Sequence, residues 1–193
     1  MKAVVVGCGR VGAGVADELD RAGWQVLIID LNSAAFDRLP ASFAGTALRG
    51  DGTDEDVLRR AGAENADLFL ALTEGDNRNI MAAQLGIEAL GARKTVAKVN
   101  DPVRAEAYAH LGIATLCRTN LMATQILGYA GQAVPARPGI YVPENPHQHD
   151  APVAAESAPA DGDAGGSPGS PGVPGGVAVP GPTGPAGSPS AEA

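Results

Sequence analysis

Residues 2–12 read KAVVVGCGRVG, and this stretch decides the fold. Its first five residues form a short apolar run, as expected of a strand that is covered on both faces of a sheet. The turn that follows fits the G-x-G-x-x-G pattern with Gly7, Gly9 and Gly12. Because apolar residues then recur at helical spacing over 10–22, the stretch predicts a strand, a glycine-rich turn and a helix in direct succession.

Beyond this stretch, short β-branched runs alternate with longer segments of helical period, which is typical of βαβ units around a parallel sheet. We expect strands at residues 2–6, 25–30, 46–49, 67–72, 94–99 and 113–117. We expect helices at residues 10–22, 34–39, 54–61, 76–90, 102–110 and 120–130. The expected N-caps are Thr53 in a capping box with Asp56, Asp76 or Asn77, Asp101 before Pro102, and Thr119. Six strands, each followed by a helix, favour an α/β fold of the Rossmann type, a doubly wound parallel sheet of order 3-2-1-4-5-6.

The glycine turn and an acid further along the chain predict a dinucleotide site. Asp30 ends the second expected strand, 23 residues after Gly7, where an acid accepts hydrogen bonds from the ribose hydroxyls of adenosine. An acid at this position repels a 2′-phosphate. The next residues, Leu31, Asn32 and Ser33, bring no cation to pair with such a phosphate. The sequence therefore favours NAD over NADP.

Each glycine of the turn has its own expected role. Gly7 permits the tight turn, Gly9 lets backbone amides approach a pyrophosphate, and Gly12 lets the helix pack on the sheet. Arg10 and Lys98 are the cations expected near the phosphates, although an isolated surface cation is often simply solvated.

The other wall of the site is expected at residues 73–79, because ligands of open parallel sheets bind at the carboxyl ends of the strands where the strand order reverses. This segment, TEGDNRN, offers a hydroxyl, two carboxylates and two amides. Asp51 follows the third expected strand, where it either reaches the adenine edge or shapes the turn before Thr53.

Composition excludes several classes of protein. The 14 basic and 22 acidic residues give a formal net charge of −8, and six of these negative charges lie beyond residue 137. Without a basic stripe or stacking aromatics, nucleic acid is a poor candidate for a partner. Cys8 and Cys117 form no disulfide framework and are expected to be packed small residues in a reducing compartment. No signal peptide is recognisable, and the uncharged segment 119–136 has too many polar residues for a membrane span, so we expect a cytoplasmic protein without direct membrane insertion.

The last 43 residues differ from the rest of the chain. Gly and Pro make up 19 of the residues in 151–193, which contain no basic or aromatic residue. Such a segment buries little apolar surface, so we expect it to be disordered. We therefore expect a nucleotide-binding domain at 1–131, a linker at 132–150 and a disordered tail. His147 and His149 of the linker are a poor metal site, and we expect no metal.

Five motifs in a fixed order carry a resemblance to a known family. They are GCGRVG at 7–12 with Asp30, GDGT at 50–53, TEGDNRN at 73–79, AKVNDP at 97–102 and LGIATLC at 111–117. Together they resemble the N-lobe of the RCK or KTN domain, the TrkA type of cytosolic regulator of potassium channels and transporters.

This resemblance implies a Rossmann lobe that binds NAD, NADH, ATP or ADP and is not an enzyme. It implies a homodimer or higher ring, paired through the helix after the sixth strand, at the inner face of the membrane beside a membrane-embedded potassium transporter or channel subunit. The nucleotide contacts implied by position are Gly7, Cys8, Gly9, Arg10, Val11, Gly12, Asp30, Leu31, Asp51, Gly52, Thr73, Glu74 and Lys98. Lys98 stands where the family often has Arg, and Lys lacks the planar fork that binds phosphate in a bidentate manner.

Two other functions are compatible with the residues alone. One is a small NAD-dependent oxidoreductase or epimerase, which the absence of a recognisable substrate domain disfavours. The other is a nucleotide-binding module that acts on a soluble partner.

Overall fold

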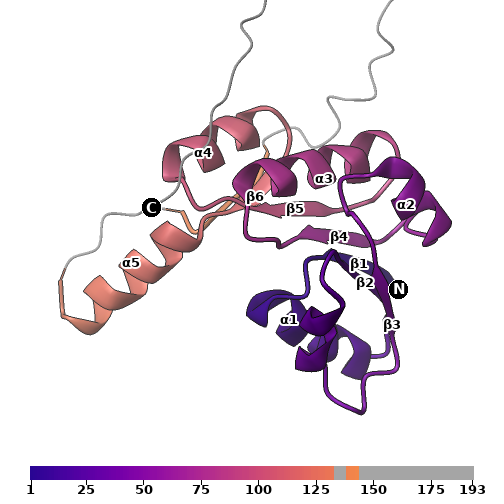
Figure 1. Cartoon of the computed structure of the whole chain (residues 1–193). Helices are drawn as coiled ribbons and strands as arrows, with labels where there is room; N and C mark the ends of the chain where they lie inside the picture. Colours follow the sequence, from indigo (N-terminus) through magenta and orange to yellow (C-terminus); the bar gives the residue numbers. More distant parts are fainter. Residues whose placement is uncertain (133–137, 144–193) are drawn as a thin grey trace, which may run out of the picture. The chain divides into compact units, whose positions relative to one another are not determined.

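A seven-stranded sheet organises the computed structural model, which describes residues 1–132 and 138–143 (Figure 1). The strands are β1 (Lys2–Val6), β2 (Gln25–Asp30), β3 (Thr46–Arg49), β4 (Leu68–Ala71), β5 (Thr95–Lys98), β6 (Ala114–Leu116) and β7 (Ile140–Tyr141). Their order is β3-β2-β1-β4-β5-β6-β7, and all neighbours are parallel except β6 and β7. The predicted order 3-2-1-4-5-6 is confirmed, with one antiparallel strand added beside β6.

Helices cover both faces of the sheet. They are α1 (Arg10–Arg21), α2 (Glu55–Arg60), α3 (Asp76–Glu88), α4 (Pro102–His110) and α5 (Arg118–Tyr129), with a 3-10 helix η1 (Ser33–Arg38). α1 and η1 lie on one face, and α2, α3 and α4 lie on the other (Figure 1). In the central strand β1, Val4 and Val6 pack under α2 to α4, whereas Val5 packs under α1, because successive side chains of a strand point to opposite faces.

Three predicted helix caps are wrong. α2 is capped by Asp54, whose carboxylate accepts from Val57 N at 3.1 Å, because Thr53 instead donates to Asp51. α3 follows Gly75 and has no side-chain cap, so neither Asp76 nor Asn77 is its cap. The third is α5.

The start of α5 differs from the prediction because Thr119 has another partner. Cys117 occupies the N-cap position of this helix, but its side chain does not cap it, and Thr119 Oγ1 donates to Asn100 O at 2.6 Å. The predicted cap of α4 is confirmed, since Asp101 Oδ1 accepts from Val103 N at 2.9 Å.

The segment expected as a linker contains β7. Its position is fixed by backbone pairing, with Cys117 N donating to Gly139 O at 2.8 Å. The hydroxyl of Tyr141 accepts from Asn120 Nδ2 at 3.0 Å, which links β7 to the first turn of α5. The predicted tail (151–193), His147 and His149 lie outside the described residues.

α5 has few contacts with the rest of the domain and projects away from the sheet in Figure 1. Asn120 is its one buried residue. No helix within 1–132 and 138–143 combines the length and the apolar character that crossing a membrane requires.

Candidate functional site

A cleft of about 330 Å³ lies at the carboxyl ends of β1, β2, β3 and β4. The predicted site residues among its lining are Gly7, Cys8, Gly9, Asp30, Leu31, Asp51, Gly52, Thr73 and Glu74. This is the crevice expected where the strand order reverses, between β1 and β4.

The glycine turn is built by close backbone packing. Gly7 has a φ of +103°, a conformation that side chains with a Cβ rarely adopt, and its N–H donates to Ile29 O at 2.7 Å. A Cβ on Gly12 would lie 1.9 Å from Gly7 O, so α1 packs directly against the turn. A Cβ on Gly9 would meet no atom within 4 Å. The backbone at Gly9 is therefore open toward a ligand, while the other two glycines are required by packing.

The first turn of α1 has the properties of an anion site. Gly9 is its N-cap, no side chain caps the free N–H groups, and no acid occupies the first turn. Uncapped N–H groups and the helix dipole favour a phosphate at such an end.

Asp30 braces the glycine turn from the end of β2. Its Oδ2 accepts from Cys8 N at 2.7 Å, and its Oδ1 accepts from Asn32 N at 2.8 Å. Each carboxylate oxygen can accept a second hydrogen bond. Asp30 can therefore hold the turn and accept from a ligand hydroxyl at the same time.

The thiol of Cys8 is a structural group. It is fully buried and donates to Ala35 O at 3.3 Å, which ties the glycine turn to η1. Burial, with a contribution from the charge of Asp30, raises the pKa of Cys8, and Arg38 opposes this effect. A protonated thiol in this position is not a nucleophile.

Asp51 shapes the turn after β3 and also lines the cleft. Its Oδ1 accepts from Thr53 N at 2.9 Å and from Thr53 Oγ1 at 2.7 Å. These two hydrogen bonds hold the pKa of Asp51 below its usual value, with a further contribution from Arg78. Gly52 packs on β1, since a Cβ there would lie 2.1 Å from Val6 Cγ1.

A fully buried amide, Asn79, holds the wall formed by Thr73. Asn79 Oδ1 accepts from both Thr73 N and Thr73 Oγ1 at 2.7 Å. Asn79 Nδ2 donates to Thr73 O at 3.1 Å and to Lys98 O at 2.8 Å. One side chain on α3 thus joins the ends of β4 and β5, and its hydrogen-bonding capacity is fully used.

We expect Asn79→Ala to lower the free energy of unfolding by about 3 kcal/mol, because several buried polar groups of β4 and β5 lose their partner. Chemical denaturation measures this difference. Gln84→Ala is the matched control, since Gln84 is an exposed amide on the same helix and should change stability by about 0.5 kcal/mol or less. Equal losses in the two variants would contradict the structural role of Asn79.

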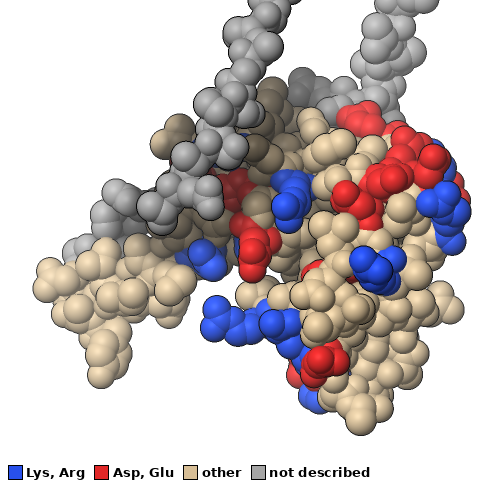
Figure 2. All heavy atoms as spheres, viewed as in Figure 1, with Lys and Arg blue, Asp and Glu red and all other residues tan. Residues whose placement is uncertain are grey.

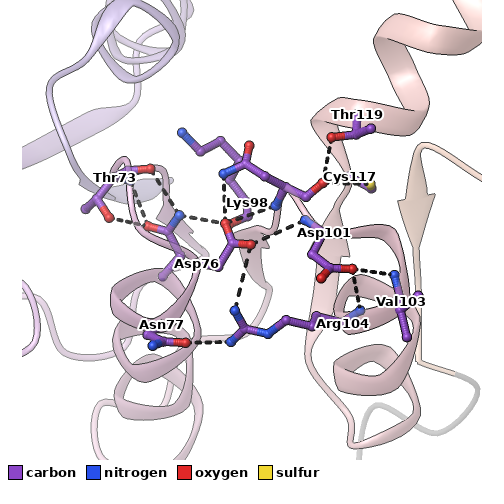
Figure 3. A network of polar contacts seen from close by, with 11 residues as sticks. Thr73, Asp76, Asn77, Lys98, Asp101, Val103, Arg104, Cys117 and Thr119 are labelled. Atoms are coloured by element: carbon purple, nitrogen blue, oxygen red, sulfur yellow. Dashed lines mark hydrogen bonds and ion pairs between the residues drawn. The ribbon is translucent and has the colours of Figure 1, made fainter.

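A second polar cluster borders the cleft at the start of α3 (Figure 3). Asp76 Oδ1 accepts from Asn100 N at 3.0 Å and Asn100 Nδ2 at 2.8 Å. Arg104 of α4 donates to Asn77 Oδ1 at 2.5 Å and lies 4.0 Å from Asp76 Oδ2. These contacts join α3 to the segment between β5 and α4.

Four predicted site residues do not line the cleft: Arg10, Val11, Gly12 and Lys98. Arg10 and Val11 are exposed on α1, and Gly12 lies behind the turn. The side chain of Lys98 is 8% exposed. Burial lowers the pKa of Lys98, helped by Arg118 and opposed by the acids Asp76 and Glu74.

The cations that line the cleft are Arg38 and Arg78, and the sequence did not single out either of them. Arg78 lies within the 73–79 segment, so its position was a usable signal. Arg38 is the last residue of η1, eight positions after Asp30, and only the path of η1 brings it to the cleft.

Comparison with known proteins agrees with this architecture. The family model described as TrkA-N domain matches residues 3–119, which is more than half of the chain. The chain belongs to the TrkA-N domain family. The match begins in β1 and ends in α5, so the TrkA-N domain includes the whole cleft.

Among relatives of this TrkA-N domain, the Trk system potassium uptake protein TrkA of Streptomyces coelicolor is 43% identical over 127 residues, 66% of this chain and 57% of the relative. The chain therefore spans little more than half the length of that relative.

Solved structures support the fold. The TrkA-N domain of the inner membrane protein ybaL from Escherichia coli is 16% identical, with a TM-score of 0.59 and coverage of 66% of this chain and 95% of the other. The AMP-bound Kef CTD from Shewanella denitrificans is 22% identical, with a TM-score of 0.54 and coverage of 69% and 84%. At these identities the similarity concerns the fold alone.

Proposed function

We propose that this protein is a nucleotide-sensing regulatory subunit of a Trk/Ktr-type potassium uptake system, in which nucleotide binding controls potassium transport. The observation that carries the proposal is the cleft at the ends of β1 to β4, formed by a glycine turn and an acid in a TrkA-N domain. The name of the Streptomyces coelicolor relative supports potassium uptake as the process.

The ligand we propose is NAD or NADH, with ATP and ADP as alternative adenine nucleotides. The open space at Gly9 and the uncapped start of α1 fit a pyrophosphate, and Asp30 fits the ribose. Asp51 and Gly52 lie toward the adenine end, and Thr73 and Glu74 toward the distal end. The AMP-bound Kef neighbour supports an adenine nucleotide as the ligand class.

We assign a supporting role to the remaining predicted residues. Arg10 and Val11 contribute N–H groups of the first turn of α1, Gly12 sets the distance between helix and turn, and Cys8 fixes the turn to η1. Lys98 contributes its backbone to the wall through Asn79.

The cleft is better suited to binding than to catalysis. Among the described residues that line it there is no His, Lys or Tyr, which are common general acids and bases. The Cys8 thiol is buried and protonated, and Asp30 and Asp51 are engaged with backbone groups, which leaves Glu74 as the remaining carboxylate among the described lining residues. These features argue against the oxidoreductase or epimerase alternative.

The proposed partner is a membrane-embedded potassium transporter or channel subunit, and the proposed location is the cytoplasm, peripheral at the inner face of the membrane. The proposed functional unit is the lobe 1–131, followed by the linker 132–150 and the tail 151–193.

α5 is the proposed contact between two copies in a homodimer or higher ring. Apart from Arg118 at its start, α5 carries no charged residue, and Figure 2 shows its surface as almost entirely uncharged. Met122 and Ile126 are 56% and 63% exposed, although they lie one helical turn apart on the same face. A helix with exposed apolar side chains, one charged residue and one buried residue is suited to packing against a second copy.

Titration calorimetry of the purified protein with NAD, NADH, NADP, ATP and ADP tests the ligand. We expect NAD or NADH to bind more tightly than NADP, and Asp30→Ala to lose dinucleotide binding because it removes both the ribose acceptor and the brace of the turn. Equal affinity for NAD and NADP would contradict the role given to Asp30.

A further inference from the structure

Residues 31–33, directly after β2, include no cation, but a cation from further along the chain lines the cleft together with Asp30. Arg38 lines the same cleft as Asp30, from the last position of η1. It is exposed, and within the described part of the chain its guanidinium makes one hydrogen bond, to Ala35 O at 3.3 Å, and no ion pair. Four of its five N–H donors are therefore free for a ligand.

Asp30 does not neutralise this cation. Both of its oxygens accept backbone N–H groups, from Cys8 and from Asn32, and no ion pair joins it to Arg38. The two charges nevertheless act on one neighbour, since Asp30 raises the pKa of Cys8 and Arg38 lowers it. A fixed carboxylate and a free guanidinium thus border the same end of the cleft.

We propose that Asp30 and Arg38 together determine the response of this site to a phosphate on the adenosine ribose, with Arg38 as a second specificity-determining residue. Asp30 repels a 2′-phosphate, and its position is held by two backbone hydrogen bonds. Arg38 attracts the same phosphate and has the planar fork that binds it in a bidentate manner. The native site rejects NADP because the fixed carboxylate stands at the ribose, and Arg38 supplies phosphate affinity once that charge is removed.

This inference rests on the proposed binding of an adenine dinucleotide. Titration calorimetry with NAD and NADP should be run on the wild type, Asp30→Asn, Arg38→Ala, and the double variant. Asp30→Asn keeps one side-chain oxygen for the brace while removing the charge. The measured quantity is the ratio of NADP to NAD affinity in each protein.

We expect Asp30→Asn to raise this ratio by about tenfold or more, as a charge-assisted phosphate contact allows. In the Asp30→Asn background, Arg38→Ala should return the NADP-to-NAD ratio to a low value, and Arg38→Lys should retain part of the increase. Arg49→Ala is the matched control in the Asp30→Asn background. Arg49 is also exposed and pairs in register with Asp30 across β2 and β3, but it does not line the cleft.

A second test uses no Asp30 variant, so a folding defect caused by a substitution of Asp30 cannot affect its result. In the wild-type background, Arg38→Ala should lower the remaining NADP affinity several-fold and leave NAD affinity within about twofold. The inference is overturned if the higher NADP-to-NAD ratio of Asp30→Asn persists after Arg38→Ala is added, or if Arg49→Ala lowers that ratio equally. It is also overturned if Arg38→Ala weakens NAD and NADP binding alike, which would indicate that Arg38 stacks on the adenine ring. Failure of the wild type to bind any adenine nucleotide would instead refute the proposed function.

Discussion

Gly12→Ala should abolish nucleotide binding and lower the free energy of unfolding by about 3 kcal/mol. The added Cβ would lie 1.9 Å from Gly7 O and 3.1 Å from Gly7 C, and both atoms belong to the backbone. Gly7 cannot retreat, because its own amide donates to Ile29 O, and because the backbone of Thr73 is so close that a Cβ on Gly7 would lie 2.8 Å from Thr73 N. The start of α1 must therefore move away from the turn, which is costly in a packed interior. Thermal or chemical denaturation and calorimetry measure the two effects.

Substitutions at two other glycines of the same region separate the effect on folding from the effect on binding. Gly14→Ala meets no atom within 4 Å and lies in the exposed interior of α1, so it should stabilise the protein by about 0.4–1 kcal/mol and leave binding unchanged. Gly9→Ala also meets no protein atom, but it fills the space proposed for the pyrophosphate. It should preserve the fold and lose the ligand. Nucleotide binding at wild-type strength in Gly12→Ala or Gly9→Ala would refute the phosphate cradle.

The second large effect is expected at α5. Ile126→Asp combined with Leu127→Asp should convert a dimer into a folded monomer, because two charges would have to be buried in an apolar contact between copies. Both side chains are exposed in the single chain, by 63% and 38%, so folding of the lobe should not depend on them. Sedimentation analysis gives the mass, and circular dichroism checks the fold.

The matched control places two charges on another exposed apolar surface. Val103→Asp with Leu111→Asp alters α4 and the residue after it, and we expect this variant to remain a dimer. The described residues of the segment that contains β7, 138–143, cover only the first turn of α5. Tyr141 returns to Asn120 and Gly139 reaches Leu121, whereas Ile126 stays exposed. A monomeric wild type would contradict the proposed contact.

The strands and their order were predictable because each strand from β1 to β6 is a short apolar run bounded by turn residues. The glycine turn and Asp30 were also predictable, since their spacing is fixed by the geometry of the β1-α1-β2 unit. β7 was not, because two residues in a segment with several prolines carry no periodic signal, and their pairing depends on the edge that β6 presents.

The helix caps show a different limit. Thr53 and Asp54 are adjacent, and both are good caps, so propensity does not decide between them. The choice follows from Asp51, because the Thr53 hydroxyl donates to its carboxylate, and Asp54 caps α2 instead. At α5, Thr119 does not cap the helix because its hydroxyl donates to the backbone carbonyl of Asn100, a residue distant in sequence. Tertiary hydrogen bonds decided both cases.

The site was predicted in outline but not in its charges. Arg10 and Lys98 were expected near the phosphates, yet Arg38 and Arg78 are the cations that line the cleft. Position along a helix determines which side chains face a cleft, and for Arg38 that position depends on η1 being a 3-10 helix. The role of Asn79 was missed because its four hydrogen bonds join segments that the sequence treats separately.

Potassium uptake in cells is the most direct test of the proposed regulatory role. The gene should be deleted in its source organism and replaced by the wild type or by Gly9→Ala, and the rate of potassium uptake measured at limiting external potassium. We expect that deletion lowers the rate, that the wild type restores it, and that Gly9→Ala, although folded and present in equal amount, does not. An uptake rate that is unchanged by the deletion, or fully restored by Gly9→Ala, would contradict the proposed regulatory role.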